Sequence, residues 1–286
     1  MRTVISLIRL IRLHNTLMAA AGVWLGGYLS GLTGEEHALF LGSLSAALVC
    51  GAGNALNDYL DIEVDRLNHP RRPLPSGQLA PYQALLAALL LNLAAVVLAV
   101  AVGPAFFMLI LGAAILLLVY NIRLRKTPIW GNLVVSVLAG LTFVAGALID
   151  RPEALAELPG PLVPALYAFL FHFGRELVKD IADYHGDKTA GYRTLPSVFS
   201  IRAIQVLVAV VYLVLLVLAI TPVFMEWYSH TYAYIVILVI GIPLAGVVGF
   251  IFLSERPLRF AYSSRVLKVL MLFGLIAFLA SKKQIL

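Results

Sequence analysis

The sequence predicts an all-α integral membrane protein that forms one polytopic domain over residues 1–286 and crosses the bilayer nine times. Three observations predict this fold class: the composition, the spacing of charge-free segments and the distribution of basic residues. Hydrophobic residues make up 61% of the chain and charged residues 13%, whereas soluble domains carry about 25% charged residues. A soluble protein of this length would need more charge to cover its surface, so the composition disfavours a soluble enzyme.

Charge-free intervals mark the candidate spans, because a transmembrane helix needs about 20 apolar residues. The longest interval should hold two helices, divided near Gly103 and Pro104. The last interval is short, and it spans only if its helix begins near Ala261 and its basic side chains reach the membrane surface. The eight intervals are 13–34, 38–57, 73–122, 127–149, 158–174, 203–225, 227–254 and 269–281. With two helices in 73–122, they predict nine helices.

Basic residues fix the predicted orientation of the helices. With the N-terminus in the cytoplasm, cytoplasmic loops and helix ends receive all of the 21 lysines and arginines except Arg151, Lys282 and Lys283. This bias follows the positive-inside rule and predicts a multi-pass protein of the cell membrane. Because anionic lipid headgroups explain the basic balance, no nucleic-acid partner is expected. The single cysteine, Cys50, excludes an intramolecular disulfide.

Acidic residues gather in two short segments at the cytoplasmic ends of apolar helices. In the first segment, five polar side chains fall within about 100° of one another on a helix, and Glu63 lies on the opposite side. In the second segment, carboxylates stack in the same way if the helix continues through Gly186, with Lys179 and His172 on the same flank. The two stripes comprise Asn54, Asn57, Asp58, Asp61 and Asp65, and Glu176, Asp180, Asp183 and Asp187.

These acidic stripes need a compensating positive charge. Like charges stacked one turn apart destabilise a helix, and a charge at membrane depth costs about 2.5–3.5 kcal/mol even on lenient insertion scales. A hard cation is the natural candidate, because magnesium takes oxygen ligands and joins carboxylates to substrate phosphates. Each stripe is also followed by a basic, turn-rich loop. Two acidic helix ends with two basic loops indicate a site for a metal-bridged diphosphate.

Simpler interpretations exist for each feature taken alone. An acidic helix end can be ordinary solvated surface, and Arg71, Arg125 or Arg193 can anchor to lipid headgroups. Asn132 falls at the start of a predicted helix, where capping is its expected role. Two stripes on the same side of the membrane, each with its own basic loop, favour the diphosphate site.

The order of residues in both segments also resembles a known family. The first segment reads Asn-Asp-x-x-Asp-x-x-x-Asp over 57–65, followed by Asn-His-Pro-x-Arg-Pro-x-Pro-Ser-Gly over 68–77. The second reads Asp-x-x-Asp-x-x-x-Asp over 180–187. These long, paired motifs resemble the two signatures of the UbiA superfamily of intramembrane prenyltransferases, and the likeness covers essentially the whole chain.

The resemblance implies a helical bundle around a central cavity that opens near the cytoplasmic side. It implies that two Mg²⁺ ions bind the diphosphate of an isoprenyl diphosphate donor through Asn57, Asp61, Asp65, Asp180, Asp183 and Asp187. The residues expected to be catalytic are Asp61, Asp65, Asp183 and Asp187. Arg72 and Lys126 fall where the family places basic phosphate contacts. The further expected substrate-binding residues are Asn54, Asp58, Arg71 and Lys179.

Within the superfamily, both runs look most like the archaeal enzymes that prenylate a lipid glycerophosphate acceptor. The implied reaction moves a geranylgeranyl group from geranylgeranyl diphosphate to the hydroxyl of geranylgeranylglyceryl phosphate, which forms the second ether bond of archaeal membrane lipids. Prenylation of an aromatic or quinone precursor is the alternative. A cation-coupled transporter is an alternative of another class, although the acids cluster at one membrane edge instead of the midplane.

Overall fold

The computed structural model describes residues 2–253 and 255–281, so Lys282 and Lys283 of the charge count lie outside the described residues. Within these ranges the regular secondary structure is helical, which confirms the predicted all-α class. The α-helices are α1 (Arg2–Leu10), α2 (Leu13–Leu29), α3 (Glu36–Leu60), α4 (Ile62–Asn68), α5 (Pro81–Val102), α6 (Pro104–Ile122), α7 (Trp130–Ala147), α8 (Leu162–Thr189), α9 (Ile201–Phe224), α10 (His230–Tyr234), α11 (Ile242–Phe252) and α12 (Pro257–Leu279). The remaining segments are η1 (Leu124–Lys126), η2 (Pro152–Ala156), η3 (Leu195–Ser197) and the π-helical η4 (Ile235–Gly241).

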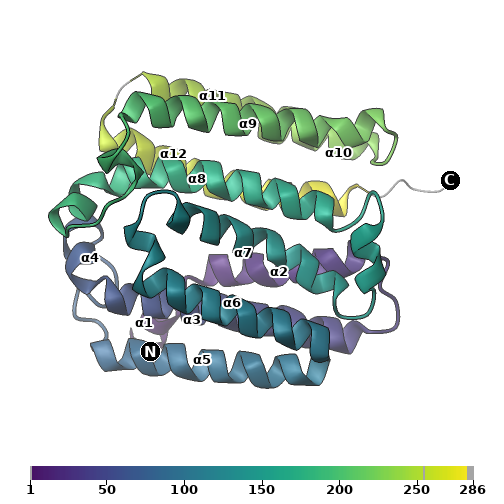
Figure 1. The fold of residues 1–286 in the computed structure, drawn as a ribbon, viewed down its shortest axis with the longest axis horizontal. Coiled ribbons are helices and arrows are strands. Elements are labelled where there is room, and N and C mark those ends of the chain that lie inside the picture. The colour runs from purple at the N-terminus through teal and green to yellow at the C-terminus, as the bar shows by residue number, and fades with distance from the viewer. Residues whose placement is uncertain (1, 254, 282–286) are drawn as a thin grey trace.

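The long helices lie side by side along a common direction (Figure 1). On one side of the bundle α8 packs against α9 and α12, and on the other side α3 packs against α2 and α5. The two sides meet where α7 contacts both α2 and α8. The long apolar segment breaks into two helices at Gly103: α5 ends before it and α6 begins at Pro104, as the sequence predicts.

Seven of the described helices are long and apolar enough to cross a membrane. The pair α1 and α2, bent by 52° at its junction, adds an eighth candidate if it forms one span. The predicted span 158–174 corresponds to the first part of α8, whose second half carries the acidic stripe. The described residues therefore hold seven or eight candidate spans, and the count of nine stays a prediction.

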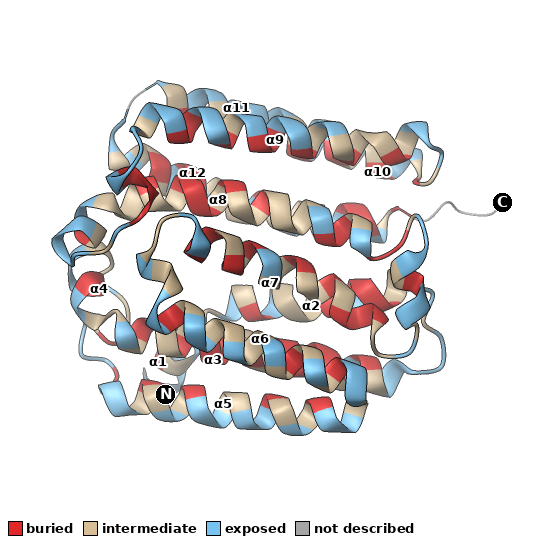
Figure 2. Ribbon diagram, viewed as in Figure 1, coloured by how far each residue is buried: buried red, intermediate tan, exposed pale blue. Residues whose placement is uncertain are grey.

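Large apolar side chains cover the outside of the bundle. Leu93 on α5 and Leu213 on α9 are each 63% exposed, and exposed segments follow the outward faces of the helices in Figure 2. An apolar surface of this extent is unfavourable in water and suits a lipid environment. The arrangement is that of a multi-pass membrane protein.

Small residues bring the central helices close together. A β-carbon at Gly26 of α2 would overlap the carbonyl oxygen of Phe143 on α7, and one at Gly146 would overlap that of Val23. Close backbone approach through small residues is a common way for membrane helices to pack, because lipid provides no hydrophobic drive between them. This contact fixes α2 against α7 beside the helices that carry the acidic stripes.

Candidate active site

The first acidic stripe crosses the junction of α3 and α4. Asp61 lies between the two helices, with φ −105° and ψ 13°. Asp58 in the last turn of α3 and Asp65 in α4 are both buried. Glu63 faces outward with its side chain 78% exposed and pairs with Arg66, as the helical periodicity predicts. The stripe therefore keeps one buried face although the helix breaks within it.

Guanidinium groups hold two of these carboxylates. Nη2 of Arg12 donates to Oδ1 of Asp58, and Nη1 of Arg72 lies 3.4 Å from the same oxygen. Nη1 of Arg72 also donates to both oxygens of Asp65 at 2.6 Å. Burial raises the pKa of Asp65 above its ordinary value, and the charge of Arg72 offsets part of this effect. Arg12 reaches the site from the α1–α2 bend, where its backbone is left-handed (φ 54°, ψ 65°).

Three segments of the chain converge on Asp61. Nη1 of Arg125 in η1 donates to Oδ2 of Asp61, and Nδ2 of Asn57 donates to the same oxygen at 3.1 Å. The hydroxyl of Tyr192, in the loop after α8, donates to Oδ1 at 2.9 Å. Burial raises the pKa of Tyr192 to about 12, so this phenol keeps its proton at neutral pH. Every carboxylate of the first stripe thus contacts an arginine.

The second stripe is continuous, because α8 runs through Gly186 to Thr189. Asp187 therefore shares the helical face of the other carboxylates. A β-carbon at position 186 would overlap Oδ1 of Asn68, and Nδ2 of Asn68 donates to the carbonyl oxygen of Asp183 at 3.1 Å. The missing side chain at Gly186 lets the end of α4 dock on α8 and brings the two stripes together.

In the second stripe, Glu176 pairs with Arg175 and Lys179, whereas the three aspartates have no such ion pair among the described residues. Nδ2 of Asn132 donates to Oδ2 of Asp180 at 3.0 Å, and Nε2 of His69 lies 3.5 Å from Oδ1 of Asp183. Among the described residues, no lysine or arginine nitrogen lies within 4.0 Å of the Asp180, Asp183 or Asp187 carboxylate. Asn132 is not the N-cap of α7, which is Ile129; it is buried and faces the acid.

Both stripes line one small polar pocket of about 80 Å³. Arg72, Arg125 and Lys179 line it as well. The predicted metal ligands in its lining are Asn57, Asp61, Asp65, Asp180, Asp183 and Asp187. Oxygen donors that lie far apart in the sequence thus share one hollow at the end of the bundle where α4 meets α8 (Figure 1).

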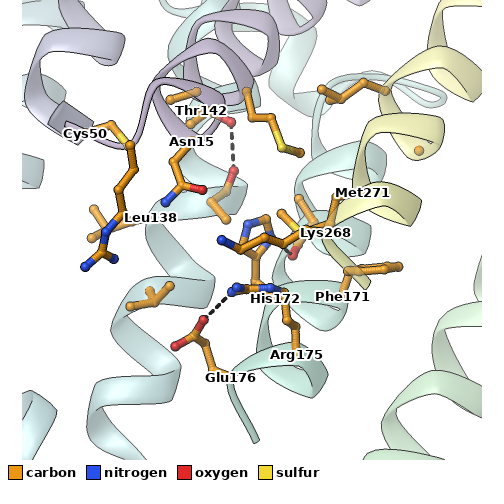
Figure 3. Close-up of a pocket in the computed structure, with 18 of the residues that line it drawn as sticks. Asn15, Cys50, Leu138, Thr142, Phe171, His172, Arg175, Glu176, Lys268 and Met271 are labelled. Carbon is orange, nitrogen blue, oxygen red and sulfur yellow. Dashed lines mark hydrogen bonds and ion pairs between the residues drawn. The ribbon is translucent and has the colours of Figure 1, made fainter. Parts of the chain in front are cut away.

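A larger cavity of about 670 Å³ adjoins this pocket, because Asn57, Arg72, Lys179 and Asp183 line both. Its walls are mainly apolar. Figure 3 shows part of the lining, with Leu138, Phe171 and Met271 beside a few charged side chains. The cavity is therefore a hydrophobic chamber with a polar, charged recess at one side.

The predicted substrate-binding residues do not all reach these hollows. Four of them line the large cavity: Asn54, Asp58, Arg72 and Lys179. Arg71 and Lys126 line neither hollow. The carbonyl oxygen of Arg71 accepts a hydrogen bond from Nη2 of Arg9 at 2.6 Å, and Nζ of Lys126 lies 5.0 Å from the centre of the Tyr192 ring. Their roles as phosphate contacts stay predictions.

The donor set fits magnesium by its chemistry. Carboxylate and amide oxygens are the ligands that Mg²⁺ prefers, and the lining of the polar pocket includes all six predicted ligands. Within 2–253 and 255–281, no three histidine, cysteine, aspartate or glutamate side chains already stand in a metal-binding arrangement. Arginine and asparagine partners hold the carboxylates of the first stripe instead. Metal binding at this pocket would require side-chain rearrangement.

The comparison with known families settles the class of the protein. The model of the UbiA prenyltransferase family matches residues 16–277. The chain belongs to the UbiA prenyltransferase family. It is 37% identical over 282 residues to the digeranylgeranylglyceryl phosphate synthase of Methanopyrus kandleri, covering 96% of this chain and 98% of the relative. The synthase of Ignicoccus hospitalis is 36% identical over 285 residues, covering 96% and 91%.

Solved structures of UbiA homologues share the fold. A structure reported for digeranylgeranylglyceryl phosphate synthase in membranes has a TM-score of 0.73 at 24% identity and covers 98% of this chain and 99% of that one. The homologue from Archaeoglobus fulgidus bound to GPP and Mg²⁺ has a TM-score of 0.65 at 21% identity, covering 96% and 99%. Family membership confirms the sequence resemblance, and it makes this UbiA protein an enzyme, which disfavours the transporter interpretation.

Proposed function

We propose that this UbiA family member transfers a geranylgeranyl group from geranylgeranyl diphosphate to the hydroxyl of geranylgeranylglyceryl phosphate. The names of its relatives support these substrates. The observation that carries the proposed chemistry is the junction of the two hollows, where Asn57 and Asp183 line both the polar pocket and the apolar cavity. A donor with an anionic head and a long hydrocarbon tail matches that junction.

The two hollows bind different parts of the donor, the cavity its tail and the pocket its diphosphate. Burying apolar chain is worth about 0.8 kcal/mol per methylene-sized unit, so the tail can supply most of the affinity from the cavity. The diphosphate then lies in the polar pocket, where Arg72 and Lys179 face it. Because tail and head are bound separately, the pocket residues are free to act on the breaking bond.

Six side chains would hold Mg²⁺ on the diphosphate, and we propose two ions. When bound, the metal draws negative charge from the leaving diphosphate. The proposed ligands are Asn57, Asp61, Asp65, Asp180, Asp183 and Asp187. Asp180, Asp183 and Asp187 of α8 form no ion pair with a lysine or arginine of the described residues, so they can take a cation without displacing one. In the first stripe, Arg72 and Arg125 would have to turn from Asp65 and Asp61 toward the diphosphate oxygens.

The chain's residues then guide a substitution at C1 of the donor. The C1–oxygen bond breaks and its electron pair leaves with the diphosphate, while the acceptor hydroxyl oxygen bonds to C1 and loses its proton. The proton acceptor is the released diphosphate or a carboxylate of α8. Leu138 and Phe171 in the cavity wall exclude water, which would otherwise capture the developing allylic cation.

We propose that the N-terminus is cytoplasmic and that the active site and the cavity opening lie near the cytoplasmic side. In that topology the bent pair α1–α2 and the apolar part of α8 complete nine spans. The loop arginines and lysines support this orientation, as does the common end of the bundle at which α4 and the end of α8 meet (Figure 1).

A transfer assay tests the proposal. Membranes containing the protein receive labelled geranylgeranyl diphosphate with geranylgeranylglyceryl phosphate or an aromatic acid, with Mg²⁺ or with a chelator. We expect labelled diether lipid only with the glycerophosphate and Mg²⁺. Labelled aromatic product would support the quinone-precursor alternative instead. Diether formation at the normal rate in chelator would contradict the metal-dependent mechanism.

A further inference from the structure

A second group of basic side chains lies in the large cavity, outside the polar pocket. Arg175 on α8 and Lys268 on α12 line the cavity but not the pocket. In Figure 3 both side chains extend into the same part of the cavity, beside His172. The donor diphosphate, held at the acidic stripes, does not account for these two cations.

The charge balance of the cavity is strongly positive. Seven lysines and arginines line it, against three aspartates and glutamates. Arg12 and Arg72 pair with aspartates of the first stripe, but the other five basic residues have few carboxylates near them. Glu176 alone serves both Arg175, at 2.6 Å, and Lys179, at 3.2 Å. An apolar chamber with surplus positive charge favours an anionic ligand.

The buried guanidinium of Arg175 has an unused hydrogen-bond donor. Its side chain is 11% exposed, and its buried Nε has no hydrogen-bond partner among the described residues. A buried donor of this kind costs free energy unless it finds an acceptor. Within the described part of the chain, only Nη1 has a partner, Glu176, so the guanidinium keeps donors for a ligand.

Lys268 faces a neutral partner. Its Nζ lies 3.0 Å from Nε2 of His14 on α2, and no carboxylate of the described residues lies within 4.0 Å of it. Lys268 of α12 and Arg175 and His172 of α8 therefore line the same cavity. A phosphate offers the several acceptor oxygens and the negative charge that such a set of donors binds best.

The position of Arg175 along α8 fits the binding of a glycerophosphate acceptor. Arg175 precedes Asp183 by eight residues, so it lies about 12 Å from it along the helix axis. In a glycerophosphate the reacting hydroxyl is only a few bonds from the phosphate. If the acceptor phosphate contacts Arg175 and Lys268, the acceptor hydroxyl can thus lie between these two side chains and the diphosphate at the acidic stripes.

We propose that Arg175 and Lys268 bind the phosphate of the lipid acceptor and so select a phosphorylated acceptor. This inference rests on the proposed function and adds the residues that would recognise the second substrate. It assigns the diphosphate to the polar pocket and the acceptor phosphate to a separate site in the cavity wall.

Equilibrium binding to the purified full-length protein tests the assignment. The probes are geranylgeranylglyceryl phosphate, the same lipid without phosphate, and geranylgeranyl diphosphate. We expect wild type to prefer the phosphorylated lipid. Lys268→Met should raise the Kd of that lipid about 10- to 100-fold, with the Kd values of the other two probes nearly unchanged. Lys268→Arg should restore most of the affinity, and Arg175→Lys should weaken binding of the same probe.

Arg259→Met is the matched control, because it removes a cation from α12 that lines neither hollow. It should leave all three Kd values unchanged. Unaltered preference for the phosphorylated lipid in Lys268→Met would overturn the assignment, as would an equal loss of diphosphate affinity. Diether synthesis by wild type is measured in parallel. If phosphate preference depends on Lys268 but no diether forms, the phosphate site stands and the proposed function fails.

Discussion

The two acidic stripes look alike in the sequence but differ in their partners. The carboxylates of the first stripe contact Arg12, Arg72 and Arg125. On α8, Glu176 contacts Arg175 and Lys179, but Asp180 contacts Asn132 and Asp183 contacts His69. The first stripe is therefore part of an ion-pair network that ties the α1–α2 bend, α3, α4 and η1 together, whereas the aspartates of the second have no arginine or lysine partner among the described residues. Two similar motifs can thus line one pocket with different partners.

The largest effect is expected from Asp183→Asn in the second stripe. This change removes a proposed metal ligand, and a Lewis-acid contribution of several kcal/mol corresponds to a loss of activity of about 1,000-fold. The unfolding midpoint should stay the same or rise, because like charges on α8 repel each other. Labelled-donor turnover and thermal unfolding in the same detergent provide the two measurements. Substantial residual activity would contradict the role given to α8.

Asp58→Asn should behave differently, because it breaks the first stripe's network. The Asp58 side chain is 2% exposed and two arginines contact it. Losing one member of a buried ion pair costs 3–5 kcal/mol, and the 21% exposure of Arg12 reduces the expected loss to about 2–3 kcal/mol. The midpoint should fall clearly. An unchanged midpoint would show that the pairs of this stripe do not stabilise the fold.

Gly186→Ala tests the contact that joins the stripes. The added methyl group would displace the Asn68 side chain and break its hydrogen bond to the backbone of Asp183. A hydrogen bond is worth about 1 kcal/mol, so we expect about a fivefold loss of turnover. Gly246→Ala on α11 is the control, because a β-carbon there meets nothing within 4 Å. Equal turnover in both variants would refute the docking role of Gly186.

The smallest effect is expected from Glu63→Ala. Glu63 belongs to the first motif by sequence, but it points away from the pocket and pairs only with an exposed Arg66. Exposed ion pairs contribute little to stability. Turnover should stay within about twofold of wild type. A loss as large as that of Asp183→Asn would refute the assignment of roles by helical face.

Much of this arrangement follows from the sequence alone. Hydrophobic runs separated by charges predict the helices, including the division at Gly103, and the 3.6-residue periodicity separates Glu63 from the buried acids. The count of nine spans is harder, because α8 combines an apolar first part with a charged second part. Composition cannot decide how much of such a helix lies in lipid.

The partners of the acids could not be predicted, because they depend on tertiary contacts. Arg12 and Tyr192 lie far from Asp58 and Asp61 in the sequence, and no local pattern links them. Asn132 looks like a helix cap until α7 is seen beside α8. Gly186 looks like a helix breaker, whereas it makes room for Asn68. In each case packing between elements decided the role.

The most direct test is the affinity of purified protein for geranylgeranyl diphosphate, measured across a range of Mg²⁺ concentrations. Wild type, Asp61→Asn and Asp183→Asn are compared, with one carboxylate removed from each stripe. If both stripes bind one diphosphate through shared cations, Mg²⁺ should lower the Kd of geranylgeranyl diphosphate for wild type. It should not lower the Kd for either variant. Full Mg²⁺-dependent tightening in either variant would show that its stripe takes no part in binding the donor.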